Sequence, residues 1–458
     1  MTNASAAVSQ SHHLTRLARW TSLLGLGLLA STWPLWLGPV EFPQIPLSVS
    51  LVSVPLWFDW MGLAGLIGGL FGVLWGNPRT MSLAWLSVLL GGFTLVALDQ
   101  HRLQPWLYQL LFISLIFLCS ERRRIPHLLT WIVVSIYVYS ALGKFDAEFL
   151  HTVGQLFWQG MLEILGRSQA GNGEVPIGWI ALLPMTELLL AVGLACRPTR
   201  AVAGGFAMIF HLLLIVLLGP LGLNHSWGVV LWNLQFAGQA WILFVWPELN
   251  GRRVNTAAVA TDRTLSDSAA HAVGTGSGLR QRMGNGLTTL VAAGVIALPV
   301  VERWGFWDHW TSWALYAPHS SRVEVWVAGT AVDRLPASLQ QMMPAESAEL
   351  LWIRLPLERW SLAETKTPIY PQARFQFGVA VELARRVQSD FLIKAIVRGV
   401  AARWDGRRQS REVVGSTAIE QTAERLFWLN VQPRSSDATS VPLLIDQVVD
   451  ETTSPEPT

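Results

Sequence analysis

Long apolar stretches set the strongest limit on what this chain can fold into. A helix needs about 20 mostly apolar residues to cross the hydrocarbon layer of a bilayer, and nine segments approach or reach that length. They cover residues 20–38, 57–75, 81–98, 106–120, 126–143, 177–195, 201–220, 226–246 and 285–303. We therefore predict an α-helical polytopic membrane bundle of about nine spans. The segment 106–120 is marginal by length alone, but omitting it would break the charge alternation described below.

The composition agrees with a membrane protein. Only 14% of the residues are charged, whereas soluble globular proteins carry about 25%. The 24 tryptophans suit a chain that meets many membrane–water boundaries. The net charge of +2 gives no reason to expect a nucleic-acid partner. Two cysteines, Cys119 and Cys196, cannot form a disulfide framework, and no zinc-binding pattern accompanies them, so we predict no metal.

Arginines occur in every second connection between the predicted spans. These are Arg16/Arg19, Arg79, Arg122/Arg123/Arg124, Arg197/Arg200, Arg252/Arg253 and Arg280/Arg282. Because loops rich in Lys and Arg stay in the cytoplasm, we expect all of these connections there. Nine spans and a cytoplasmic N-terminus then place the C-terminal end outside the cytoplasm. The predicted location is the cell (inner) membrane.

The regions outside the spans differ in composition. Residues 254–283 are rich in Ser, Thr, Gly and Ala, which is typical of a flexible linker. The Ser-, Thr-, Pro- and acid-rich end is typical of disorder. We therefore divide the chain into a cytoplasmic N-terminus (1–19), a transmembrane domain of about eight spans (20–250), a flexible cytoplasmic linker (251–283), a last span (284–304), a small extracytoplasmic α+β domain (305–434) and a disordered tail (435–458).

The predicted α+β domain begins with an aromatic segment. WGFWDHWTSWALYAP (304–318) resembles an interfacial aromatic belt more than a core. RVEVWVAG then alternates like a strand, and SAELLWIRLPLERW suggests one or two more. Residues 372–387 have helical spacing. FLIKAIVRGVAARWDGRRQSREVVG is typical of strand, Asp-Gly turn and strand.

Ionisable side chains within or beside spans are costly and are candidates for function. Here they are Asp59, Asp99, His101, Lys144, Asp146, Glu187, His211 and His225. Lys144, at the end of a span, has two interpretations. The first is a snorkelling lysine paired with Asp146 or Glu148. The second is a desolvated lysine whose neutral amine acts as a base.

Two candidates lie in the middle of spans. His211 is either a neutral histidine hydrogen-bonded between helices or a donor to a bound ligand. Glu187 is either protonated or paired. GLIGGLFGVLWG (65–76) has small-xxx-small spacing, which favours a helix-packing seam over a phosphate-binding loop because the segment lies within a span.

Seven segments follow one another along the chain: VPLWFDWMGLAGLIGGLFG, ALDQHRLQPWLYQLLF, YVYSALGKFDAEF, LLPMTELLLAVGL, GGFAMIFHLLL, SWALYAPHSSRVEVWV and VRGVAARWDGRRQSREVV. In this order they resemble segments of the vitamin K-dependent γ-glutamyl carboxylase family and of bacterial relatives that share its transmembrane domain. The likeness covers most of residues 57–415. The family's paired lysines fall on Gly143 and Lys144, and the histidine of its Tyr-Phe-His span falls on His211.

The resemblance implies an enzyme that oxygenates vitamin K hydroquinone, or uses another quinone, and carboxylates a peptide glutamate. It assigns catalysis to Lys144 and His211. The residues expected to contact the quinone are His101, Gln104, Trp106, Tyr108 and His225, with Asp99, Asp146 and Glu187 as supporting polar groups. The chain departs from the family at its Asn-His pair, which falls on Leu103 and Gln104.

Three functions remain open from the sequence. The first is quinone-linked or carboxylase-like chemistry on a peptide or protein substrate at the outer membrane face, which requires Lys144 and His211 to share a cavity. The second is a non-catalytic module that binds membrane lipid or a partner through the same bundle. The third is transport, which we consider weaker because the sequence has no internal repeat.

Overall fold

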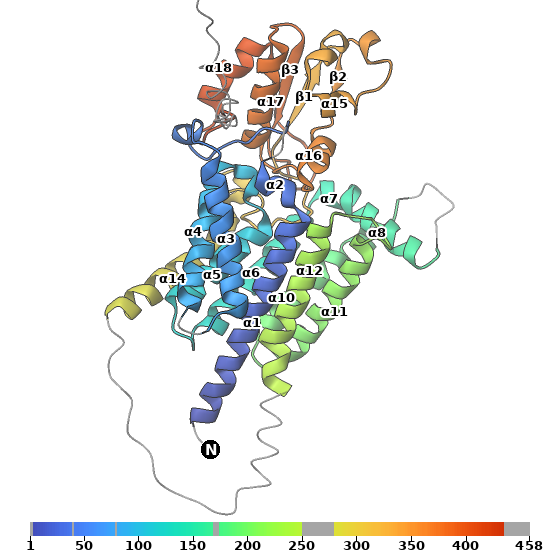
Figure 1. Cartoon of the computed structure of the whole chain (residues 1–458). Coiled ribbons are helices and arrows are strands. Elements are labelled where there is room, and N and C mark those ends of the chain that lie inside the picture. Colours follow the sequence, from blue (N-terminus) through green and yellow to red (C-terminus); the bar gives the residue numbers. More distant parts are fainter. Residues whose placement is uncertain (1–2, 39–40, 78–79, 168–173, 250–278, 435–458) are drawn as a thin grey trace, which may run out of the picture.

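The computed structural model describes residues 3–38, 41–77, 80–167, 174–249 and 279–434. It consists of a helical bundle with a smaller domain at one end and the N-terminus at the other (Figure 1). Most of the predicted linker and the whole predicted tail 435–458 lie outside the described residues. Residues 279–283, which we assigned to the linker, belong instead to the last long helix, α14 (Leu279–Ala297).

Within the part of the chain that the structure describes, seven helices are long and apolar enough to cross a membrane. They are α3 (Trp57–Trp75), α4 (Met81–Leu98), α6 (Ile125–Lys144), α9 with α10 (Ile177–Ile180 and Leu182–Ala195), α11 (Arg200–Leu218), α12 continued by the π-helix η3 (Trp227–Ala240 and Trp241–Val245), and α14 continued by the 3-10 helix η4 (Leu298–Trp304). These elements lie close to the bounds that hydropathy predicts. A membrane protein is therefore the class that the structure fits.

The two remaining predicted spans are helical but do not meet both conditions. α5 (Pro105–Cys119) is apolar but has only 15 residues. α1 (Asn3–Ser31) is long, but Arg16, Arg19 and the polar residues before them lower its mean hydropathy. The apolar stretch 20–38 does not coincide with a single helix. The helix begins at Asn3, and Pro34 interrupts it because proline has no N–H to donate, so α2 (Trp33–Leu37) follows as a separate turn.

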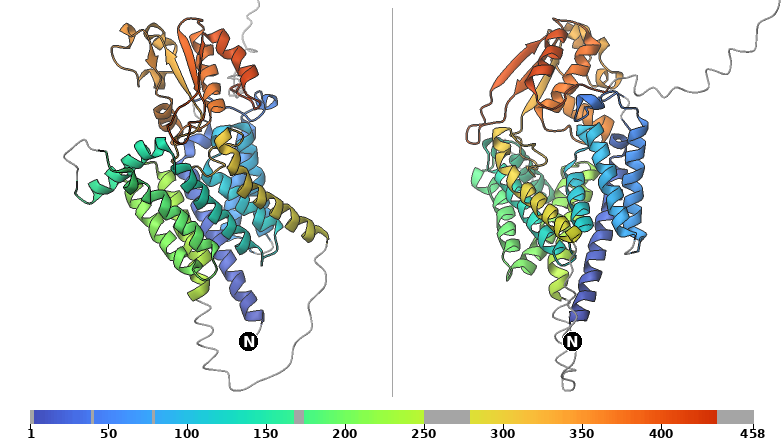
Figure 2. Two further views of the ribbon diagram at one scale, coloured as in Figure 1. Left: turned by 180° about the vertical axis from the view of Figure 1, so that it is seen from behind. Right: turned by 90° about the vertical axis from the view of Figure 1, so that its left-hand side faces the viewer.

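Small residues bring α3 and α4 into close contact. A Cβ atom added to Gly69 would lie 2.7 Å from the backbone of Ala84 and Val88. One added to Gly91 would lie 2.5 Å from the Gly62 carbonyl oxygen. Glycine at these positions lets the two backbones approach. The predicted packing seam is confirmed. On the far side of the bundle, α14 crosses α5 and α6 (Figure 2).

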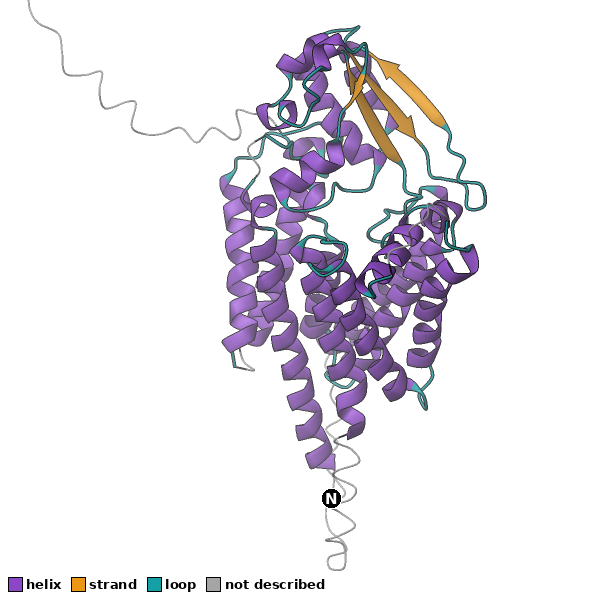
Figure 3. Ribbon diagram, turned by 90° about the vertical axis from the view of Figure 1, so that its right-hand side faces the viewer, coloured by secondary structure: helices purple, strands orange, loops and turns teal. Residues whose placement is uncertain are grey.

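The C-terminal domain contains a four-stranded antiparallel sheet in the order β2-β1-β3-β4. The strands are β1 (Arg322–Val327), β2 (Ile353–Arg354), β3 (Ile393–Arg398) and β4 (Ser410–Val414). α17 (Ala373–Val387) packs on β1 and β3, and α18 (Ser416–Leu426) packs on α17. Figure 3 shows the sheet at the end of the molecule farthest from the N-terminus. The predicted strands and helix are confirmed, except that one expected strand is shortened to β2 and followed by α16 (Leu357–Thr365).

The bundle and the C-terminal domain are interlocked. Phe42 and Ile45, from the connection between α2 and α3, belong to the core of the C-terminal domain. Near the other end of the chain, Arg434 donates to the carboxylate of Asp59 on α3 (2.7 Å). Asp59 also pairs with Arg102, which follows α4. All three charged side chains are buried. The domain 305–434 is therefore joined to the bundle both by a common hydrophobic core and by a buried network of ion pairs.

The prediction of an interfacial aromatic belt over residues 304–318 is wrong in part. Trp304 and Phe306 are well exposed, as a belt requires, but Trp313 is wholly buried. Its ring packs 5.0 Å from Tyr108 of α5. Residues 308–319 therefore form a buried layer between the bundle and the sheet. Hydropathy identified the aromatic character of this segment, but it could not show that the C-terminal domain covers part of it.

Asp99, which follows α4, should make stability depend on pH. Its carboxylate accepts from the backbone N–H groups of His101 (3.1 Å) and Ile45 (3.3 Å), yet burial raises its pKa from 3.8 to about 6. A raised folded-state pKa means that stability is present below the unfolded-state value and is lost as pH rises through the folded one. We expect the loss to total roughly 3 kcal/mol between pH 4 and pH 8.

Asp99→Asn should remove that loss while keeping an oxygen acceptor. The free energy of unfolding, measured in detergent micelles at several pH values, should therefore rise for the variant relative to the native chain as pH increases. Asp333→Asn, at an exposed carboxylate, is the matched control. Parallel pH profiles for Asp99→Asn and the native chain would contradict the assignment.

Candidate functional site

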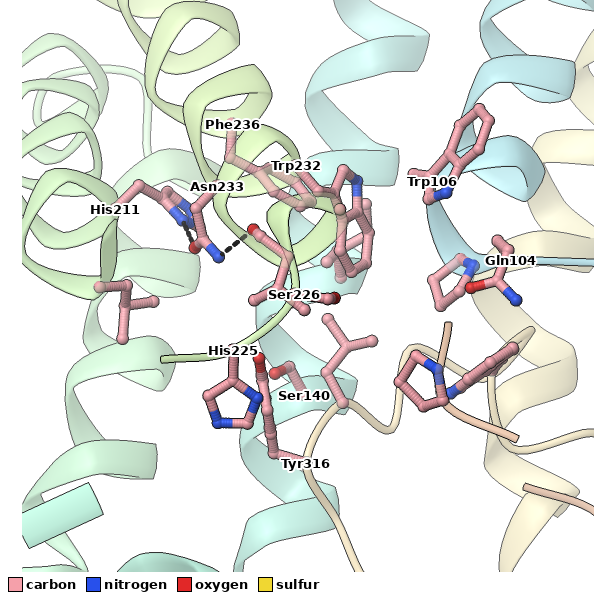
Figure 4. A pocket seen from close by; sticks show the side chains of 18 of the residues that line it. Gln104, Trp106, Ser140, His211, His225, Ser226, Trp232, Asn233, Phe236 and Tyr316 are labelled. Atoms are coloured by element: carbon pink, nitrogen blue, oxygen red, sulfur yellow. Dashed lines mark hydrogen bonds between the residues drawn. The ribbon is translucent and has the colours of Figure 1, made fainter. Parts of the chain in front are cut away.

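A cavity of about 350 Å³ lies where the bundle meets the C-terminal domain. Both catalytic candidates, Lys144 and His211, line it. Its walls come from α5, α6, α8 (Val153–Ile164), α10, α11, α12 and two loops of the C-terminal domain. Figure 4 shows His211 and Asn233 on one side, Gln104 and Trp106 across from them, and His225 near Tyr316. The shared cavity is the arrangement that the enzymatic hypothesis requires.

Lys144 forms a buried ion pair. Its Nζ donates to both carboxylate oxygens of Glu187 on α10, at 2.8 and 2.9 Å. It also donates to Ser140 Oγ at 2.6 Å, one turn earlier on α6. The side chain is only 5% exposed, so the prediction of a lysine snorkelling to solvent was wrong. The predicted partners are occupied elsewhere: Asp146 binds Arg303, and Glu148 binds Arg408.

His211 is held from both sides. Nδ1 lies 2.9 Å from Asn233 Oδ1 of α12, and Nε2 lies 2.7 Å from the Tyr137 hydroxyl of α6. Asn233 Nδ2 donates to the Val229 carbonyl, so its Oδ1 is the acceptor for His211. A neutral imidazole with its proton on Nδ1 satisfies the whole set, and Nε2 then accepts from Tyr137. His211 is thus hydrogen-bonded between helices while one face of its ring stacks on Phe236.

Tyr316 brings an unused hydroxyl to the cavity. The oxygen is buried, and no hydrogen-bond partner for it exists among the described residues. Burial raises the pKa of Tyr316 above its ordinary value, so the group is a neutral donor. Its φ of +59° is uncommon for a residue with a side chain. His225 packs edge-on against the ring at 5.7 Å, and burial lowers the pKa of His225, which keeps that imidazole neutral at pH 7.

The rest of the cavity wall is largely aromatic. Trp106, Trp232, Phe236 and Trp310 line it. Gln104 joins them, with its Nε2 donating to the His101 carbonyl at 2.8 Å. An apolar cavity with a few converging polar groups is the usual form of a site for a small molecule. It suits a flat or elongated ligand that carries a few polar groups.

Six of the ten predicted site residues line the cavity, and four do not. The six are Lys144, His211, Gln104, Trp106, His225 and Glu187. Of the others, His101 Nε2 lies 2.8 Å from the Pro368 carbonyl oxygen and 3.2 Å from Thr367 Oγ1, behind the wall that those two residues form. Burial lowers the pKa of His101 to about 4. Asp99 and Asp146 accept from backbone N–H groups at their own helix starts, and Tyr108 packs on Trp313.

Some cavity residues were missed although a signal existed. Tyr137 and Ser140 lie seven and four residues before Lys144, so all three share one face of α6. Periodicity around a candidate lysine could have found them. Tyr316 and Asn233 gave no such signal, because each reaches the cavity only through the packing of distant elements.

No family model, curated protein or solved structure matches this chain.

Proposed function

We propose that the cavity binds a hydroquinone or a related lipid with a phenolic ring, and that Lys144 with Glu187 accepts a proton from it. The single observation that carries the proposal is the ion pair of Lys144 and Glu187 in the wall of a mostly aromatic cavity. We propose that the chain is an enzyme similar to the vitamin K-dependent γ-glutamyl carboxylases and that it acts on a peptide or protein substrate. When bound and oxygenated by dioxygen, the hydroquinone would supply the strong base that removes the γ-proton of a peptide glutamate, and carbon dioxide would take the place of that proton.

The ion pair can hold its proton in two ways. In water, lysine keeps its proton and the carboxylate stays ionised. In a low-dielectric site both charges lose hydration, so the neutral pair of amine and carboxylic acid comes closer in free energy. Transfer of one proton from Lys144 to Glu187 would leave a neutral amine at the cavity wall. That amine is a base for a ring hydroxyl, and Ser140 Oγ at 2.6 Å would keep it oriented.

The residues present fit a ring with two oxygens. The cavity volume of about 350 Å³ lies at the lower end of the usual range for ligand sites, roughly 300–1,000 Å³. Tyr316 offers a buried hydroxyl without a partner among the described residues, which can bond one ring oxygen. Lys144 can meet the other. The rings of Trp232 and Phe236, which also line the cavity, provide flat apolar contacts.

We propose that the cavity faces the outer side of the cell (inner) membrane. The long helices alternate in direction, so the connections from α5 to α6 and from α10 to α11 lie at the end opposite the C-terminal domain (Figure 1). These connections contain Arg122 and Arg197. Basic connections favour the cytoplasm. A peptide substrate would then approach through the C-terminal domain, two of whose loops line the cavity, and membrane lipid would surround the bundle.

A non-catalytic module that binds lipid or a partner is the second candidate, and one observation favours it. Both ring nitrogens of His211 are occupied by protein groups, and Lys144 already donates to four oxygen atoms of Glu187 and Ser140. A site built only to hold a lipid could keep these groups in this resting state.

Binding and chemistry can be tested separately on the full chain in detergent. We expect reduced 2-methyl-1,4-naphthoquinone to quench tryptophan fluorescence saturably, whereas its dimethyl ether, which has no ring O–H, should bind more weakly. Tyr316→Phe should weaken binding about 2- to 10-fold, the value of one hydrogen bond. His127→Gln, at an exposed histidine on α6, is the control and should bind normally.

Chemistry is measured as hydroquinone-dependent incorporation of labelled carbon dioxide into a glutamate-containing peptide. The native chain should incorporate label and Lys144→Met should not. Incorporation by Lys144→Met would remove the assigned base. Saturable binding without incorporation by the native chain would favour the non-catalytic module, and absence of saturable binding would overturn the proposal.

A further inference from the structure

We infer that Glu302, His309 and His319 form a site for a first-row divalent metal ion of the zinc type. One carboxylate oxygen and one nitrogen from each imidazole lie within 4.8 Å of one another. Glu302 is 7% exposed, His309 3% and His319 0%. This cluster lies outside the cavity wall, and the inference does not depend on the proposed function.

The three side chains are already oriented toward a common point. His309 Nδ1 lies 2.8 Å from Glu302 Oε1. His319 Nε2 lies 3.1 Å from the same oxygen and 3.0 Å from Oε2. In a tetrahedral site with bonds of about 2.0–2.1 Å, donor atoms stand about 3.3 Å apart. The distances from the two imidazole nitrogens to the carboxylate oxygen therefore need to lengthen by only a few tenths of an ångström, and the two nitrogens already lie within 4.8 Å of each other.

The donor set selects the class of metal. Two imidazole nitrogens and one carboxylate oxygen suit zinc and its first-row neighbours. Calcium and magnesium prefer oxygen ligands throughout. Three protein ligands leave a fourth position for water or another small ligand.

The surrounding charges do not prevent binding. Arg303, next to Glu302 in the chain, is neutralised by Asp146, and Arg403 is also near the cluster. Without a metal, the Glu302 carboxylate is hydrogen-bonded to both imidazoles. His319 Nδ1 is buried and has no hydrogen-bond partner among the described residues. A bound dication would be compensated by the carboxylate and would replace the two imidazole hydrogen bonds with stronger bonds.

The position of the cluster suggests what the ion would do. The chain between η4 and β1 has no regular secondary structure, and two of its residues, Trp313 and Tyr316, have positive φ values. His309 and His319 bracket this stretch, while Glu302 belongs to the end of the last span. A metal bound to all three side chains would link the segment between η4 and β1 to the end of the last span. It would also hold Trp310 and Tyr316 at the cavity wall.

The test is the metal content of the full chain, purified in detergent with a histidine-free tag and without chelator. We expect about one equivalent of zinc or another first-row metal by mass spectrometry, and a marked loss in Glu302→Gln and His319→Gln. His127→Gln, at an exposed histidine away from the cluster, should keep the metal. After chelation, zinc but not magnesium should raise the melting temperature.

Cobalt loading of His309→Cys tests the position of the ion independently, because His309 faces the site through Nδ1, the ring nitrogen nearer to Cβ, and a cysteine Sγ has a similar reach. A thiolate ligand should add a sulfur-to-cobalt charge-transfer band that the native chain lacks. Native protein that is folded but metal-free, and whose melting temperature does not respond to zinc, would overturn the inference. Metal retained equally by Glu302→Gln and His319→Gln would also overturn it, because the ion would then lie elsewhere.

Discussion

Asp59→Ala should destabilise the folded chain by about 3–5 kcal/mol, the cost of leaving buried charges without their partner. Asp59 holds two guanidinium groups, those of Arg102 and Arg434, whose side chains are 0% and 2% exposed. Arg102 also donates to the Leu35 carbonyl, but no other carboxylate pairs with it among the described residues. Removing Asp59 therefore leaves two cations in an apolar junction.

Unfolding in detergent, followed by tryptophan fluorescence, measures this loss. Asp405→Ala is the matched control, because Asp405 pairs with Arg407 while both side chains are at least half exposed. Exposed ion pairs contribute about 0–1 kcal/mol, so the control should differ little from the native chain. If Asp59→Ala fell within the range of the control, the buried network would not hold the two domains together.

Glu187→Leu and Lys144→Met should each destabilise the folded chain far more than the two substitutions do together. The single variants leave a buried charge unpaired, at about 3–5 kcal/mol, whereas replacing both partners by apolar residues is often close to neutral. Lys144→Met with Glu187→Leu should therefore recover most of the lost stability. A double-mutant cycle on unfolding free energies isolates the coupling.

The same double variant separates folding from function. It should be stable yet fail to incorporate carbon dioxide, because neither the base nor its proton partner remains. Arg354 and Glu358, an exposed pair on β2 and α16, provide a control cycle whose coupling should be within a few tenths of a kcal/mol. Additive effects at Lys144 and Glu187 would show that the pair contributes no special stability.

The spans were predictable because hydropathy is a local property. An apolar run that must cross about 30 Å of hydrocarbon has a required length, and α3, α4 and α6 begin or end within a residue or so of the predicted bounds. The strands around the Asp405–Gly406 turn were also predictable, since alternation and turn residues act over a few positions. α1 was not, because its polar first half becomes a helix through continuity with the apolar half.

The sequence allowed several residues of the site to be predicted, but not the partners of those residues. Lys144, Glu187 and His211 each stood out as polar groups in apolar surroundings. Their partners did not, because a hydropathy profile does not define how each helix is rotated about its axis. Nearness in sequence suggested Asp146 and Glu148 for Lys144, but Arg303 and Arg408 bind those carboxylates from residues more than 150 positions away.

The sequence by itself determined the helical bundle, the approximate ends of most helices and the polar residues that a bilayer makes expensive. These depend on the length, apolarity and periodicity of single segments. The tertiary structure alone decided that Lys144 meets Glu187 and that Tyr316 reaches the cavity. It also decided that Glu302 gathers two histidines. Each of these arrangements depends on how separate segments pack against one another, and pairing across such distances leaves no mark on local composition.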